Sequence, residues 1–212
     1  MKVTHLGHSA VLVEAASTRL LLDPGNFSNA WHGLTDLTAV VVTHQHPDHV
    51  DPEHLPALLQ ANPSARLLTE PQVAEVWDLP RAEPVSAGET MTIGDVTLSA
   101  VGGTHAVIHR DIPVIGNIGV VVESSDGRRF FHPGDSLDAV PAGVDVAAIP
   151  AHGPWCAMKE IIDFARALAA PRGFLIHEGL VNERGWALSF GRIGAMSPTE
   201  LTDLRGGGSL DV

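Results

Sequence analysis

The chain has 212 residues, of which 44% are hydrophobic, and it carries a formal net charge of −12 at pH 7. This length and apolar content are typical of one well-buried globular domain and exclude a mainly disordered chain. The acidic balance, with scattered arginines, disfavours nucleic-acid binding. No apolar run reaches the length of about 18 residues that spans a membrane, so we expect a cytoplasmic protein.

Short strands dominate the first half of the chain. The segment 3–14 alternates weakly and leads into RLLLD, residues 19–23, which predicts a strand pair joined by a turn. The run TAVVVTH, residues 38–44, is continuously apolar in its centre, as expected of a strand covered on both faces. After these come a short helix through Leu58 and Leu59, a strand at 65–70, a helix at 71–77 and a meander of short strands at 83–87, 90–93 and 96–100.

The second half combines a hairpin with strands and helices. A loop at 106–116 precedes the hairpin 119–132, which turns at Ser-Asp-Gly, and an apolar stripe at helical spacing predicts a helix over 158–170. Helices follow strands without separating every pair, so two packed sheets with helices outside fit better than a Rossmann fold or a barrel. The other predicted elements are strands at 144–150 and 173–178, a helix at 181–191 and a last strand near 209–212.

Four metal-binding side chains lie in THQHPDH, residues 43–49, where the chain leaves a predicted strand. The two-residue period of a strand projects His44 and His46 to one side, while Asp48 and His49 can return across the next turn. Side chains so close in sequence cannot all surround one small tetrahedral ion without strain, so the spacing predicts two adjacent metals. A polar loop of surface histidines is the alternative, and it leaves the pattern unexplained.

Further ligands for two metals are expected where other strands end. His105 and Asp135 each follow a predicted strand of the middle of the chain, and His177 follows GFLI, residues 173–176. A glycine-containing turn or a polar break lies close to each of them. These three side chains are therefore the predicted distant partners of the 43–49 cluster.

In this order, THQHPDH, the isolated His105, the GDS around Asp135 and the IHE around His177 resemble the metallo-β-lactamase superfamily. The opening HLGHSAVLVE and the later LLLDPG resemble its branch of ascorbate-6-phosphate lactonase-like metal-dependent hydrolases. The resemblance covers nearly the whole chain. It implies an α+β protein of a single domain, residues 1–212, folded as a four-layer αββα sandwich with its site at one edge.

The resemblance also implies a dinuclear centre. Two divalent ions, zinc or alternatively manganese, would share a hydroxide that attacks a small ester, lactone or phosphoester. Asp48 would orient that hydroxide or take its proton. One metal would be held by His44, His46 and His105, and the other by Asp48, His49 and His177, with Asp135 bridging both.

Residues beside these ligands have predicted roles or open alternatives. Asp23, at the end of the second strand, is expected to support a ligand histidine. His152 stands where relatives often carry small glycines and is the predicted proton donor to the leaving group. His8 either caps a turn or touches substrate. Arg110 either meets an anionic substrate as loop 105–116 closes, or lies in a solvated loop.

Other conspicuous side chains are expected to serve the structure or face solvent. Cys156, the only cysteine, is expected to be a small buried side chain rather than a nucleophile. Trp155 is the one tryptophan beside a predicted site loop. The histidines expected to have no direct role are His5, His32, His54, His109 and His132.

Two other classes of function remain open from the sequence. A mononuclear iron enzyme of the dioxygenase type could use His44, His46 and His105 alone. A non-catalytic metal-binding protein could keep the fold, although the full ligand set argues against it. The expected partner is a small-molecule substrate, anionic if Arg110 contacts it, and a homo-oligomer is left open.

Overall fold

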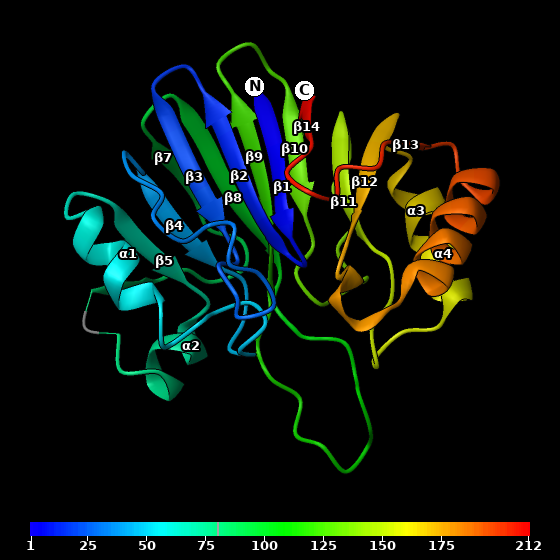
Figure 1. Cartoon of the computed structure of the whole chain (residues 1–212), viewed down its shortest axis with the longest axis horizontal. Coiled ribbons are helices and arrows are strands. Elements are labelled where there is room, and N and C mark those ends of the chain that lie inside the picture. Colours follow the sequence, from blue (N-terminus) through cyan, green and yellow to red (C-terminus); the bar gives the residue numbers. More distant parts are fainter. Residues whose placement is uncertain (80) are drawn as a thin grey trace.

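Two mixed β-sheets pack face to face in the computed structural model, which describes residues 1–79 and 81–212. Helices cover the outer face of each sheet, so the layers run helix, sheet, sheet, helix across the molecule (Figure 1). This arrangement confirms the predicted α+β class and the αββα sandwich. Within the described ranges, no helix combines the length and apolar character that crossing a membrane requires.

The first sheet joins the two ends of the chain. Its order is β14-β1-β2-β3-β4-β5-β6, antiparallel from β14 to β3 and parallel from β3 to β6. Its strands are β1 (Lys2–Gly7), β2 (Ala10–Ala15), β3 (Thr18–Leu22), β4 (Ala39–Val42), β5 (Arg66–Thr69), β6 (Ala82–Pro84) and β14 (Ser209–Asp211).

The second sheet is built from the middle and later parts of the chain. Its order is β13-β12-β11-β10-β9-β8-β7, antiparallel from β7 to β10 and parallel from β10 to β13. Its strands are β7 (Thr90–Ile93), β8 (Val96–Gly102), β9 (Ile118–Ser124), β10 (Arg129–His132), β11 (Val146–Pro150), β12 (Arg172–Ile176) and β13 (Glu200–Leu201).

The helices lie where their apolar faces meet the outer sides of the sheets. In helix α3 (Met158–Leu168), Ile161, Ile162 and Ala165 from the predicted stripe are buried against the second sheet. The first sheet is covered by α1 (Leu55–Ala61) and α2 (Pro71–Val76), and the second by α3 (Met158–Leu168) and α4 (Glu183–Met196), with the short 3₁₀ helix η1 (Glu178–Leu180) after β12.

Strand β4 is apolar at every position because both of its faces are covered. Ala39 and Val41 face the core between the two sheets, whereas Val40 and Val42 pack with Leu55 of α1 on the other side. The four strand residues are fully buried. Because side chains of a strand alternate between faces, a strand covered on both needs apolar residues at every position. The predicted central strand is confirmed, and it delivers the 43–49 segment to the edge of the sandwich.

Three elements differ from the predictions. Segment 3–14 forms two strands, because the chain turns at His8, whose φ is +52°. The expected meander at 83–100 is divided between the sheets, since β6 pairs with β5 in the first and β7 with β8 in the second. Strand β13 was not expected, because two residues are too few to show a hydrophobic period.

Candidate metal centre

The segments that follow several strands meet at one edge of the sandwich. The 43–49 segment follows β4, Asp135 lies in the turn after β10, and His177 directly follows β12. His8 reaches the same place from the turn between β1 and β2. Clefts outside the carboxyl ends of strands are common ligand sites in layered α and β proteins. All seven predicted ligands are brought together here, and His8 joins them.

The eight side chains form two groups, and within each group one ligand atom per residue lies within 4.8 Å of the others. We name each group by one member. The His46 group contains His44, His46, His105 and Asp135, and the His177 group contains His8, Asp48, His49 and His177. This division agrees with the predicted one except that His8 is added and that Asp135, predicted to bridge both metals, falls in the His46 group. The binding of metal by these residues stays a prediction.

The His46 group is held by close contacts among its imidazoles. Nε2 of His44 lies 3.1 Å from Nδ1 of His46. Oδ2 of Asp135 lies 3.5 Å from Nε2 of His105 and 3.9 Å from Nε2 of His44. The other nitrogen of His105, Nδ1, lies 2.6 Å from the carbonyl oxygen of Ala106, which fixes the ring and leaves Nε2 directed at the centre.

The His177 group is arranged around Asp48. Oδ2 of Asp48 lies 3.0 Å from Nε2 of His8, 3.5 Å from Nε2 of His177 and 3.9 Å from Nε2 of His49. The rings of His8 and His177 pack at 4.2 Å between centroids. The sequence alone left His8 undecided, because its GHS is not a ligand motif and only the fold brings the β1–β2 turn to the end of β12.

Asp135 links the two groups. Its Oδ1 lies 3.1 Å from Nε2 of His49, and its Oδ2 lies 3.2 Å from Nε2 of His177. The indole of Trp155 donates a 2.7 Å hydrogen bond to the same Oδ2. Asp135 therefore occupies the position between the groups that a bridging carboxylate requires, and Trp155 holds it there. The sequence had marked Trp155 only by its nearness to a site loop.

Several buried polar atoms of this centre have no hydrogen-bond partner among the described residues. They include Nε2 of His105, Nε2 of His177 and Oδ1 of Asp135, which lie at ion-pair distances from neighbouring side chains but without hydrogen-bond geometry. Leaving a buried polar atom unsatisfied costs about 1–3 kcal/mol, so such atoms are rare without a reason. Imidazole nitrogens and carboxylate oxygens are also the ligands that zinc and similar divalent ions take. The residues present therefore fit a metal centre.

Asp23, at the end of β3, supports this centre from behind, as predicted. Its Oδ2 lies 2.7 Å from Nδ1 of His49 and accepts a 2.8 Å hydrogen bond from the hydroxyl of Thr43. The backbone N–H of Thr43 donates to Oδ1 at 2.8 Å. A carboxylate on Nδ1 fixes the orientation of an imidazole and leaves Nε2 for other partners. Nε2 of His49 accordingly points at Asp135.

The backbone of this region takes conformations that need external support. φ is +52° at His8, +47° at Asp23 and +63° at His177, in the left-handed region that non-glycine residues rarely occupy. Such positions persist where surrounding contacts fix them, and they are frequent at functional sites. Gly25 is required for a different reason, because a Cβ there would lie 1.8 Å from the carbonyl oxygen of Asp48. The loop after β3 thus packs directly on the 43–49 segment.

Burial keeps two imidazoles of the His46 group neutral in the metal-free protein. Burial lowers the pKa of His44 well below its ordinary value, and the nearby His49 adds to the effect. The pKa of His46 is lowered mainly by burial and next by His105. Because metal ions bind the neutral form of imidazole, these two side chains are ready to coordinate without losing a proton.

At His49, Asp48 and Asp135, neighbouring charges and hydrogen bonds outweigh the effect of burial on the pKa. Burial by itself would lower the pKa of His49, but the carboxylates of Asp135 and Asp23 outweigh it and raise that pKa well above its ordinary value. Burial would raise the pKa of Asp135, yet His49 and His177 hold it well below its usual range. Burial is likewise outweighed at Asp48, where the hydrogen bond with His8 lowers the pKa to about 2. The two carboxylates beside His49 therefore favour its protonated form.

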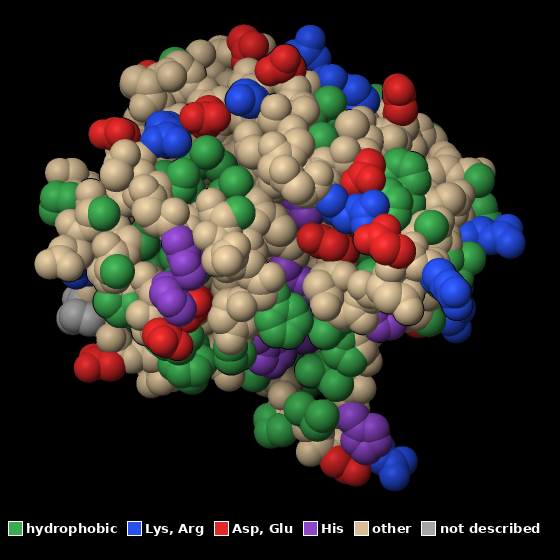
Figure 2. All heavy atoms as spheres, in the orientation of Figure 1, with side chains coloured by type: hydrophobic (Ala, Val, Ile, Leu, Met, Phe, Trp, Pro, Cys, Tyr) green, Lys and Arg blue, Asp and Glu red, His purple; other side chains and the backbone are tan. Residues whose placement is uncertain are grey.

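Two predicted site residues lie outside both groups. His152 is exposed, in the loop before α3. Arg110 is 87% exposed, with Nε 3.7 Å from Oδ1 of Asp111. It lies on the long loop between β8 and β9, which projects from the body of the molecule and carries basic, acidic and histidine side chains (Figures 1 and 2). Their contacts with substrate stay predictions.

Several of the remaining side chains lie where they were expected. His5 and His132 are buried, and their Nε2 atoms lie 3.0 Å and 2.9 Å from the carbonyl oxygens of His8 and Ser9. Cys156 is half-buried rather than fully buried. Burial, with Asp135 nearby, raises the pKa of its thiol to about 12, so the thiolate that a nucleophile needs is scarce at neutral pH.

Comparisons with known proteins agree with the fold. A family model described as a beta-lactamase superfamily domain matches residues 2–172. Protein Rv0786c of Mycobacterium tuberculosis is 45% identical over 205 residues, 94% of each chain. A UPF0173 metal-dependent hydrolase of Alkaliphilus metalliredigens is 28% identical over 184 residues, 80% of each. The crystal structure of the metallo-beta-lactamase fold protein YhfI from Bacillus subtilis has a TM-score of 0.75 at 15% identity, covering 99% of this chain and 98% of that one, and shows the shared fold.

Proposed function

The chain belongs to the β-lactamase superfamily, and from that premise we propose that it is a metal-dependent hydrolase with a dinuclear centre. The centre holds two divalent ions, zinc or manganese, and cleaves a small ester, lactone or phosphoester. Support comes from the relative named a metal-dependent hydrolase and from the donor set of the two groups. The ascorbate-6-phosphate lactonase-like branch stays a prediction.

One observation carries the dinuclear proposal. Asp135 contacts both sets of imidazoles: its carboxylate lies 3.1 Å from His49 and 3.2 Å from His177 in the His177 group, and 3.5 Å from His105 in the His46 group. A single tetrahedral ion uses four protein ligands at most, whereas eight candidate ligands meet here. A carboxylate between two ligand sets is the arrangement expected when two ions share one bridging residue.

The residues of the chain divide the work of such a reaction. Bound divalent ions supply a water of lowered pKa and polarise an oxygen of the substrate. Asp48, whose pKa is about 2, stays ionised at neutral pH and therefore orients a donor rather than storing a proton. Asp23 fixes His49 through Nδ1, and Trp155 fixes Asp135 through its indole N–H.

The loop between β8 and β9 shields one side of the centre. Ile108, Ile112 and Val114 line a small cavity of about 20 Å³ together with His46 and His105. Apolar side chains over an electrostatic centre exclude water and strengthen the interactions inside it. Closure of this loop on a small substrate would also bring Arg110 towards an anionic group, which favours phosphorylated or carboxylated substrates.

The experiment is a measurement of retained metal. Untagged protein, purified without chelator and desalted, should retain two zinc or manganese ions per chain by elemental analysis. The variants His46→Ala and Asp135→Ala should lose metal and hydrolysis together in a screen of lactones, esters and phosphoesters. Asp138→Asn is the matched control, because Asp138 is exposed in the same loop as Asp135.

Two outcomes would overturn the proposal. Hydrolysis retained by either variant would show that the centre is not the site of the reaction. One retained iron per chain, with oxygen uptake in the presence of a thiol substrate, would favour the mononuclear redox enzyme instead.

A further inference from the structure

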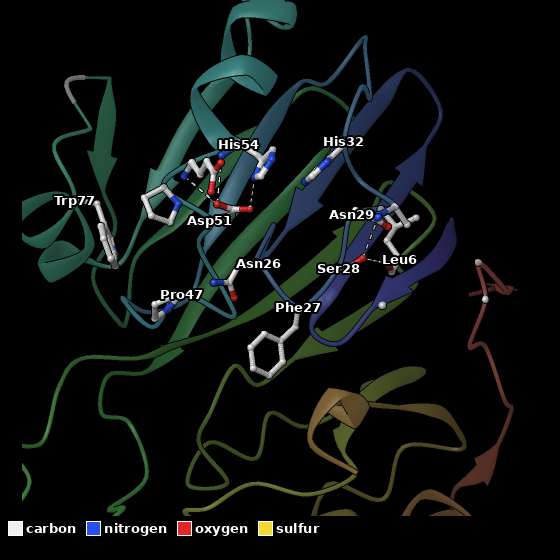
Figure 3. Close-up of a pocket in the computed structure, with 16 residues that line it drawn as sticks. Leu6, Asn26, Phe27, Ser28, Asn29, His32, Pro47, Asp51, His54 and Trp77 are labelled. Carbon is white, nitrogen blue, oxygen red and sulfur yellow. Dashed lines mark hydrogen bonds and ion pairs between the residues drawn. The ribbon is translucent and has the colours of Figure 1, made fainter. Parts of the chain in front are cut away.

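A third cluster of metal-binding side chains lies apart from the centre. His32 lies in the loop between β3 and β4, and Asp51 and His54 lie just before α1. One ligand atom from each lies within 4.8 Å of the other two. All three line a cavity of about 1040 Å³ whose lining includes none of the eight side chains of the two groups. Figure 3 shows the two imidazoles side by side, with Asp51 next to His54.

The carboxylate of this cluster is buried and fixed. Asp51 is 4% exposed, and its Oδ1 accepts hydrogen bonds from the backbone N–H groups of Glu53 and His54 at 2.9 Å and 3.3 Å. Its Oδ2 lies 2.8 Å from Nδ1 of His54. A carboxylate on one nitrogen of an imidazole orients the ring and raises the basicity of the other nitrogen, as in carboxylate–histidine–metal sites. The free Nε2 of His54 is thus presented as a ligand.

Hydrogen bonds within the turn before α1 account for Asp51 and His54 but leave His32 unexplained. The ring of His32 lies 4.3 Å from that of His54, centroid to centroid, with 19° between the planes. His32 is exposed, and among the described residues its side chain makes no hydrogen bond or ion pair. Two exposed imidazoles from segments about 20 residues apart therefore meet above a buried carboxylate.

We propose that His32, His54 and Asp51 form a separate binding site for one divalent transition-metal ion of the zinc, nickel or copper type. The imidazoles bind the ion through nitrogen, and Asp51 orients His54 and supplies negative charge. Imidazole suits these ions better than magnesium or calcium, which prefer sets of oxygen ligands.

An ion at this site would tie together two segments that flank the main centre. Asn26 donates from its backbone N–H to the carbonyl oxygen of Pro47 at 2.9 Å, and Asp51 donates in the same way to Pro24 at 2.9 Å. The same loop carries Phe27, whose ring packs 4.8 Å from that of His8. The third site therefore acts as a clamp between the β3–β4 loop and the start of α1.

The test compares total metal per chain at saturation. Protein with its retained ions is titrated with Zn²⁺ by calorimetry, and retained and added ions are summed. The variants His32→Ala and His54→Ala should bind one ion fewer than the unaltered chain. Asp51→Asn keeps a side-chain oxygen that can accept from the backbone N–H groups of Glu53 and His54. It removes the negative charge and should weaken binding of that ion by about 10- to 100-fold. His109→Ala, which removes a histidine with a 57% exposed side chain on the distant loop, should change nothing.

A second measurement keeps the inference testable if a variant folds poorly. In unaltered protein labelled with ¹⁵N at histidine, one added equivalent of Ni²⁺ should broaden the imidazole resonances of His32 and His54 before those of His109 and His152. An unchanged zinc count in folded His32→Ala protein would overturn the inference. Broadening that falls first on other histidines would overturn it equally, whatever the metal content of the main centre.

Discussion

The His46 group and the His177 group both contact Asp135 but draw their distant members from different strands. Two of the four members of the His46 group, His44 and His46, come from one short stretch at the end of β4. The His177 group adds His8 from the first turn of the chain and His177 from near its end. Each group therefore takes two members from the 43–49 segment, but the distant pair of the His46 group follows β8 and β10, whereas that of the His177 group depends on strands β1 and β12 reaching the same edge. Local spacing reveals only the half of each group that lies in the 43–49 segment.

The two groups also differ in charge. Burial leaves His44 and His46 with lowered pKa values, whereas Asp135 and Asp23 raise the pKa of His49 despite its burial. In the metal-free protein the His46 group thus offers neutral imidazoles, and the His177 group contains a protonated one. The His46 group should fill first, because its ligands need not release a proton.

Removing the shared carboxylate should have the largest effect. Asp135→Ala deprives both groups of their common oxygen ligand, so both ions should be lost, and hydrolysis should fall on the order of a thousandfold or more. Elemental analysis and turnover of the same preparation measure the two effects. If one ion remained at full occupancy, Asp135 would serve as a ligand in one group only and would not bridge the two ions.

Removing one imidazole from each group should separate the two sites. His46→Ala should lose the ion of the His46 group, and His177→Ala that of the other, each variant keeping about one ion per chain. We expect affinity at the altered site to fall more than the 10- to 100-fold typical of indirect partners, because a direct ligand is lost. Zinc titration with a competing chelator measures both. Loss of both ions in each variant would mean that the groups bind only as a unit.

Removing the indole hydrogen bond should have an intermediate effect. The ring of Trp155 lies 6.0 Å from that of His105 and 5.9 Å from that of His177, centroid to centroid. Trp155→Phe keeps an aromatic ring there but deletes the 2.7 Å hydrogen bond to Asp135. Metal affinity should fall by about 10- to 100-fold, as for other partners that orient a ligand. Trp186→Phe, on α4, is the matched control. Unchanged affinity would reduce Trp155 to a packing residue.

The sequence predicted most of this centre because its chemistry lies at strand ends. The valines of β4, buried on both faces, mark the strand from which His44 and His46 emerge, and His177 follows a similar apolar run. The position of His8 beside the other side chains could not be predicted, since Gly7 in the same turn indicates the turn but not which strand ends it meets. The division of strands between the two sheets was also out of reach, because runs as short as β6 and β7 carry no signal of the sheet they join.

The third site was missed for a related reason. His32 and His54 are about 20 residues apart in loops without a period, so no spacing joins them, and each alone looks like a surface histidine. Only the packing of the β3–β4 loop on the start of α1 brings their rings together. Metal sites assembled from two loops are for this reason harder to predict than sites on consecutive strand ends.

The smallest expected effect is a difference in pH dependence between the groups. With a pKa raised well above its ordinary value, His49 is protonated at neutral pH, and an ion entering the His177 group must displace that proton. Affinity there should rise about tenfold per pH unit until the pKa of His49 is passed, because one proton is released. His44 and His46 already lack a proton at neutral pH, so affinity in the His46 group should be nearly flat between pH 6.5 and 8, a window that lies above the ordinary histidine pKa of about 6.5. The variants His46→Ala and His177→Ala isolate the two groups, and calorimetry in buffers of different ionisation enthalpy counts the protons. Equal proton release in both variants would contradict the difference in protonation between His49 and the imidazoles of the His46 group. The two groups would then differ only in the strands that supply their members.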